Sequence, residues 1–129
     1  MSFTGIRGLL VAAVAAELPG VTVEQEMPDS LVPPAVVVRY DGTNLGSPGL
    51  WVHAYLLECW PSTDLTSSSH YASRDELLTA VMKALQSLQL EGAGLSSWSA
   101  GTDERELGQQ RYRIATVTAL VTEPALCPS

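Results

Sequence analysis

Two stretches of the chain carry apolar side chains at the spacing of an amphipathic helix. The first covers residues 5–18 and ends at Pro19 and Gly20, which stop a helix. The second begins at Ser73, where Glu76 lies three residues on and completes a capping box, and its apolar stripe runs toward a stop at Gly92. The sequence therefore predicts one helix at the start of the chain and one in its second half.

The remaining apolar residues alternate with polar ones or lie in β-branched runs, as they do in strands. Residues 41–49 and 92–110 are rich in turn-forming or small polar residues and are predicted as loops, the second with a short strand inside it. The predicted strands are 21–27, 35–40, 50–60, 95–100 and 111–123. The order helix-strand-strand-strand-helix-strand-strand indicates an α+β fold in one domain, 1–129, with two helices and a mainly antiparallel sheet of about four to five strands.

The stretch LWVHAYLLECW at 50–60 is largely apolar on both faces, which is typical of a central strand that is covered on two sides. The second face has three possible covers: one of the two helices, a loop folded over it, or another subunit. Aromatic side chains on the face of a small domain mark interaction sites. We therefore expect Trp51, Tyr55 and Trp60 to belong to a subunit interface.

The charge of the chain is strongly negative. Its 129 residues include 14 acidic and 7 basic side chains, which gives a net charge of −7. Tight binding of nucleic acid depends on Lys and Arg neutralising phosphates, so we do not expect it here. The apolar run at 8–16 is too short to span a bilayer and no signal peptide is visible, so neither a membrane nor an export route is predicted.

Residues that could carry chemistry are few and do not converge in the sequence. His53 and Cys59 share one strand but lie roughly 20 Å apart along it, and His53 between two aromatic residues indicates packing. His70 follows a run of serines, which is no evidence for a triad. The histidines and cysteines lack metal-ligand spacing, and Cys59 and Cys127 could form one bridge that nothing demands. We therefore predict no catalytic, metal or cofactor site, and a protein that is not an enzyme.

The order and local texture of these elements resemble the tail terminator, or tail completion, proteins of long-tailed phages. The likeness covers nearly the whole chain. It rests on the successive stretches VTVEQEMP, PPAVVVRYDG, LWVHAYLLECW, SRDELLTAVMKALQSL and RYRIATVTALVTE. The proline-introduced valine strand, followed later by the ELLTAVMKAL helix, is the most telling combination.

The resemblance implies a structural virion protein that assembles into a hexameric ring. Such a ring caps the tail tube below it, joins the neck or connector protein above it, and lets DNA pass through its lumen only in transit. It would lie at the tail–neck junction of the virion, and in the host cytoplasm during assembly. An acidic lumen would not hold passing DNA, and we assign Asp103, Glu104 and Glu106 to a lumen-facing acidic loop.

Other classes of protein remain open on the sequence alone. They are another neck, connector or minor tail subunit, a small acidic chaperone or immunity-type protein that binds one basic partner, and an enzyme of unrecognised type. Arg39 also has two readings, because it ends a mostly apolar row in a chain with few basic residues. It either pairs with an acidic neighbour across the strand, which we favour, or forms a salt bridge to the next subunit of a ring.

Overall fold

Five strands form one sheet in the order β1-β2-β3-β5-β4, in a computed structural model that describes residues 3–28, 30–47, 49–88 and 94–124. Only β1 and β2 run parallel; the other neighbours are antiparallel. The elements are α1 (Phe3–Glu17), β1 (Thr22–Glu24), β2 (Ala35–Ser47), β3 (Leu50–Trp60), α2 (His70–Gln86), β4 (Gly94–Leu107) and β5 (Gln110–Pro124). The predicted α+β class, element order and mainly antiparallel sheet are confirmed.

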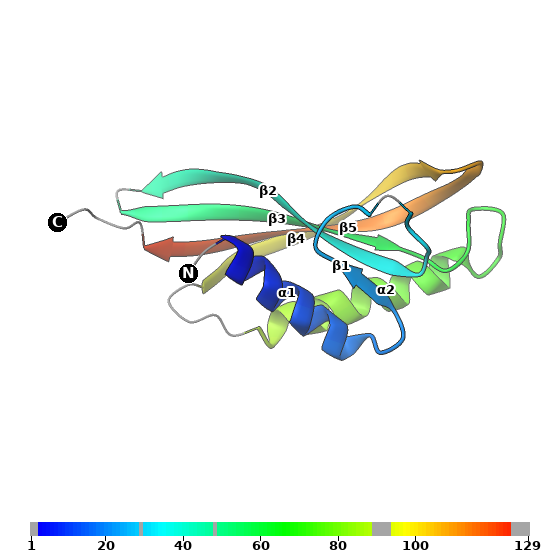
Figure 1. Ribbon diagram of the computed structural model, residues 1–129, viewed down its shortest axis with the longest axis horizontal. Coiled ribbons are helices and arrows are strands. Elements are labelled where there is room, and N and C mark those ends of the chain that lie inside the picture. The colour runs from blue at the N-terminus through cyan, green and yellow to red at the C-terminus, as the bar shows by residue number, and fades with distance from the viewer. Residues whose placement is uncertain (1–2, 29, 48, 89–93, 125–129) are drawn as a thin grey trace.

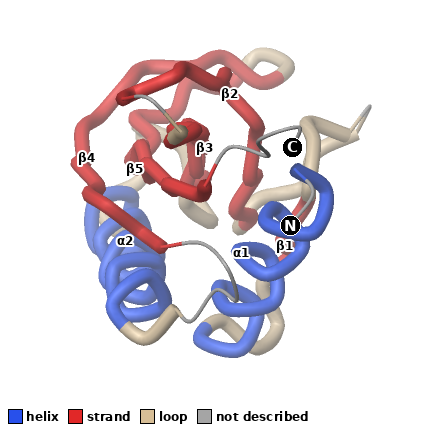
Figure 2. Tube along the Cα trace, turned by 90° about the vertical axis from the view of Figure 1, so that its left-hand side faces the viewer, coloured by secondary structure: helices blue, strands red, loops and turns tan. Residues whose placement is uncertain are grey.

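Both helices lie side by side on the same face of the sheet (Figures 1 and 2). Their apolar stripes, with Leu10 and Val14 on α1 and Leu77 and Val81 on α2, pack against the inward-facing side chains of the central strands. Successive side chains of a strand point to opposite faces. The odd-numbered residues of β3 from Tyr55 to Cys59 therefore belong to this main core, and the even-numbered ones face away from the helices.

A smaller core covers one end of the opposite face. Leu31, from the segment that joins β1 to β2, packs there against Val37, Trp60 and Tyr112, and the two aromatic rings meet edge to face at 5.7 Å. The same segment enters β2 through a cis peptide bond between Pro33 and Pro34. Thus a loop folds over part of the second face, which was one of the three predicted covers. The alternative in which one helix covers each face is wrong, because both helices pack on the same face.

Two strands, β2 and β4, extend through residues whose composition predicts loops. β2 continues past Tyr40 because the ladder absorbs one extra residue there, and Gly42 adopts a φ of 131° at this irregularity. β4 occupies 94–107, where only 95–100 was predicted as strand. In contrast, β1 is shorter than the predicted 21–27. Because β2 ends at Ser47 and β3 begins at Leu50, the connection between them is much shorter than the predicted loop at 41–49.

The second helix begins at His70, one turn before the predicted start. The hydroxyl of Ser73 does not cap the helix. Instead it accepts a hydrogen bond from the backbone N–H of Ser62 at 2.8 Å and joins the Ser62 hydroxyl at 2.9 Å. The first helix, by contrast, lies within two residues of its predicted bounds. Within the described residues, neither helix is long and apolar enough to cross a membrane.

Candidate interaction surface

The sheet face opposite the helices is left uncovered over its middle. Val52, Ala54 and Leu56 on β3 alternate with the side chains of the main core, so they point to this face, and all three are half-buried. Thr118 and Leu120 on β5 stand beside them, as the Cα partners of Leu56 and Ala54. Both helices lie on the other face of the sheet (Figures 1 and 2), and among the described residues the smaller core covers only the end of this face near Trp60. We call these five residues the open face.

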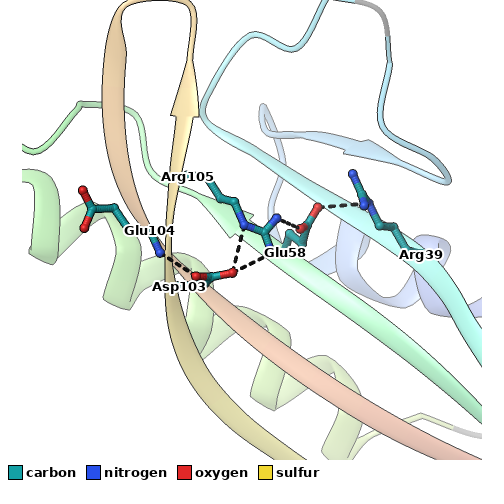
Figure 3. Close-up of polar contacts among 5 residues, drawn as sticks. All are labelled: Arg39, Glu58, Asp103, Glu104 and Arg105. Atoms are coloured by element: carbon teal, nitrogen blue, oxygen red, sulfur yellow. Dashed lines mark hydrogen bonds and ion pairs between the residues drawn. The ribbon is translucent and has the colours of Figure 1, made fainter.

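A buried carboxylate stands at the border between the open face and the smaller core. Glu58 on β3 is fully buried, and its Oε2 accepts a hydrogen bond from Arg105 Nη1 on β4 at 2.8 Å. Its other oxygen lies 3.1 Å from Arg39 Nε on β2, an ion pair that lacks the alignment of a hydrogen bond. Figure 3 shows the two arginines approaching Glu58 from opposite sides.

Arg105 reaches Glu58 by crossing the intervening strand β5. It also binds Asp103, with Nε 2.9 Å and Nη2 2.7 Å from Asp103 Oδ2. We call Arg39, Glu58, Asp103 and Arg105 the charge cluster. It links three strands of the sheet, and its four formal charges cancel.

The ionisation of the charge cluster follows from these contacts. The hydrogen bond from Arg105, together with its positive charge, lowers the pKa of Asp103 below its usual value. Partial burial by itself lowers the pKa of Arg105, but the hydrogen bonds and charges of Asp103 and Glu58 outweigh it and raise that pKa overall. Both groups are therefore charged at neutral pH, and the cluster is a network of salt bridges.

The predicted pairing of Arg39 with an acidic neighbour across the strand is confirmed, and Glu58 is that neighbour. Two of the aromatic residues predicted at a subunit interface are inaccessible. Tyr55 has no exposed surface in the main core, and Trp60 is 2% exposed in the smaller core. Trp51 is 39% exposed, but it lies on the helix side of the sheet beside Leu45. The structure therefore removes Tyr55 and Trp60 from the predicted interface and separates Trp51 from Arg39.

The predicted acidic loop is part of strand β4. Because side chains alternate along a strand, Asp103 points to the side of the charge cluster, whereas Glu104 and Glu106 point to the other face. Glu104 lies 3.3 Å from Arg111 and 3.6 Å from Arg113 on β5. No ion pair involves Glu106 in the described part of the chain. The three carboxylates thus do not form one loop surface, and their orientation toward a lumen stays a prediction.

Both histidines are buried and tie strands or loops together. His70 Nδ1 lies 2.7 Å from the Thr63 carbonyl oxygen, and its Nε2 accepts the backbone N–H of Arg113 at 3.1 Å, which fixes the neutral Nδ1–H form. His53 forms hydrogen bonds with both ring nitrogens: Nδ1 lies 2.9 Å from the Thr43 hydroxyl, and Nε2 lies 2.6 Å from Glu123 Oε1. In the part of the chain that is described, no group of three His, Cys, Asp or Glu residues is placed to hold a metal ion.

Sequence reasoning missed Glu58 and Arg105 as partners. A glutamate in the otherwise apolar row Leu50, Val52, Ala54, Leu56 was the available signal, because a carboxylate rarely enters such a row without a cation. The surface formed by the open face and the charge cluster has an apolar centre, the hydroxyl of Thr118, and guanidinium groups at its edge. A scan of known protein families finds no match for this chain, and a search of curated proteins finds none either.

Proposed function

We propose that this protein is a structural subunit of the tail terminator type, which assembles into a ring at the junction of a phage tail and neck. In this proposal the ring caps the tail tube, contacts the neck protein on its other side, and lets DNA pass through its lumen. The observation that carries the proposal is the open face. A half-buried apolar row on a central strand, with both helices on the opposite side, is a surface that a second copy of the chain can cover.

Charge supports the use of this face between copies of the chain. Subunits with a net charge of −7 repel one another, so they associate best where local charges cancel. The charge cluster provides such a region beside the open face, because two arginines there balance two carboxylates. The Nη groups of Arg39 have no partner among the described residues, and the side chain is 39% exposed, so they are available to a carboxylate of a neighbouring subunit.

The ring is tested by measuring mass and symmetry, with a variant that changes only the open face. Native mass spectrometry and negative-stain microscopy of the wild-type protein should show a closed ring, with six subunits expected. Ala54→Arg places a long charged side chain in the centre of the open face and should yield folded monomers. Ala16→Arg introduces the same change at an exposed position of α1 and should leave the ring intact.

Two outcomes contradict the proposal. A wild-type protein that stays monomeric at high concentration, also when mixed with assembled tail tubes, favours a small acidic binding protein instead. Rings that tolerate Ala54→Arg place the subunit contact elsewhere. Reversing Arg39 to Glu is a poor test, because a new carboxylate beside the fully buried Glu58 would unfold the monomer as well as break a contact.

A further inference from the structure

A groove lies between the two helices, on the side of the sheet away from the open face. Its volume is about 760 Å³. One wall is formed by the end of α1 and the turn after it, with Leu18 and Val21, and the other by α2, with Leu77 and Ala80. Leu18, Val21 and Ala80 are only half-buried, so the groove exposes apolar surface. Its volume falls in the range of sites that hold a ligand of a few side chains.

The rim of the groove is acidic. Glu17, Asp75 and Glu76 line it together with a single lysine, Lys83. Two of these carboxylates have partners: Glu17 lies 3.7 Å from Lys83, and Asp75 lies 3.2 Å from Arg74. Glu76 forms no ion pair with any described residue. One helical turn separates it from Ala80 in the apolar wall, so an apolar group in the groove would lie beside an uncompensated carboxylate.

We propose that this groove binds a short segment of a partner protein, in which apolar side chains are flanked by lysine or arginine. The apolar side chains would cover Leu18, Val21 and Ala80, and a basic residue would pair with Glu76. A second copy of this chain fits less well, because its net charge is −7 and its basic residues are few. Nucleic acid fits less well for the same electrostatic reason.

The proposal is independent of the ring. The groove is lined mainly by residues of the two helices, which lie on one side of the sheet (Figure 2), and the open face is on the other side, so both can be occupied at the same time. If the ring forms, the groove is a surface through which it can recruit a basic protein. If the ring does not form, the groove is still a binding site of a monomer.

Three synthetic peptides test the chemistry of the groove: acetyl-KKLLAKK-amide, acetyl-KKSSAKK-amide and acetyl-EELLAEE-amide. The first has both apolar and basic residues, the second lacks the leucines, and the third reverses the charge. Only the first should bind, and in NMR titrations it should shift the backbone resonances of Leu18, Val21 and Ala80. Absence of binding by the first peptide, or equal binding by either of the others, overturns the proposal.

Matched variants locate the binding. Glu76→Lys should weaken the affinity for acetyl-KKLLAKK-amide about fivefold, as expected for reversing one exposed charge contact. Glu26→Lys makes the same change at an exposed residue outside the groove and should have no such effect. Ala80→Leu should fill the groove and block binding, whereas Ala16→Leu, on the exposed side of α1, should not. Equal effects of a variant and its control would show that the peptide binds elsewhere.

Discussion

At the scale of single residues, the least expected feature is a carboxylate with no exposed surface. Burying an unpaired charge is strongly unfavourable, so Glu58 is tolerated only because two arginines reach it from neighbouring strands. Those arginines keep about a third of their side-chain surface in solvent, which lets them retain part of their hydration. Glu58 is thus the fully buried centre of the charge cluster.

We expect Glu58→Gln to lower the free energy of unfolding by about 1.5–3 kcal/mol, because Arg39 loses its counter-charge and Arg105 loses one of its two, while the shape of the side chain is kept. Urea unfolding at neutral pH measures this as a lower midpoint with an unchanged slope. Glu106→Gln is the control, since Glu106 is exposed and forms no ion pair in the described ranges. An unchanged midpoint for Glu58→Gln would mean that Asp103 alone satisfies Arg105.

The thiol of Cys59 should be unreactive in the folded protein. Burial in the main core, reinforced by the neighbouring negative charge of Glu58, raises its pKa to about 12. Since the thiolate is the reactive form, almost none is present at neutral pH. In a Cys127→Ser variant, labelling by an aromatic disulfide reagent should occur only at the rate of unfolding. Rapid labelling of the native protein would show that the core opens locally around Cys59.

At the scale of elements, long and strongly patterned segments could be predicted from the sequence, whereas segments that depend on a neighbour could not. β3 is apolar on both faces and β5 is rich in Val and Thr, so both were predicted nearly at their observed bounds. β4 contains Gly, Ser and four charged residues in a row, which resembles a loop. It is a strand because it pairs with β5 along nearly its whole length, with one irregularity between Leu95 and Ser97, and the local sequence of β4 does not indicate this pairing.

The start of α2 illustrates the same limit. Ser73 and Glu76 have the pattern of a capping box, yet the helix already begins at His70, whose ring joins the preceding loop to β5. This long-range contact overrides the local capping signal. Correspondingly, Ser69 at the observed N-cap makes no capping hydrogen bond with its side chain.

His70→Leu should therefore destabilise the protein, because the His70 ring connects α2, the loop before it and β5. It removes the acceptor for the Arg113 N–H and the partner of the Thr63 carbonyl, and buried groups left without a hydrogen bond cost about 1–3 kcal/mol each. Hydrogen exchange should show faster exchange at Arg113, and thermal unfolding should occur at a lower temperature. Ser69→Ala, one residue earlier, should change stability by less than about 0.5 kcal/mol. Equal effects of the two variants would contradict the role given to the His70 ring.

At the scale of the whole molecule, the sequence predicted the fold class and the local pairing of Arg39, but not the partition of the surface. Which aromatic residues are exposed depends on the face of the sheet against which the helices pack. A strand that is apolar on both faces, such as β3, does not indicate which face that is. For this reason Tyr55 and Trp60 were assigned to an interface although both lie in cores. The open face follows from the position of both helices on the other face of the sheet, which the sequence does not indicate.

The acidic residues of β4 would contribute differently to the lumen of an assembled ring. Asp103 and Glu104 form ion pairs with arginines, so reversing their charge would disturb the sheet. Glu106 is exposed, and its charge can be reversed without breaking an ion pair between described residues. If β4 lines the lumen, Glu106→Lys should leave the ring intact and allow it to bind short duplex DNA at low salt, which the wild-type ring should not do. Fluorescence anisotropy at low and physiological salt measures this.

The control for the lumen is a charge reversal of equal size elsewhere. Glu26→Lys also changes the net charge of a subunit from −7 to −5, but at a residue outside β4. If both variants bind DNA equally, net charge alone explains the effect and β4 does not face the lumen. If Glu106→Lys instead yields monomers, this end of β4 belongs to the contact between subunits. A gain of salt-sensitive DNA binding by the Glu106→Lys ring alone would place the exposed edge of the sheet along the path of the DNA.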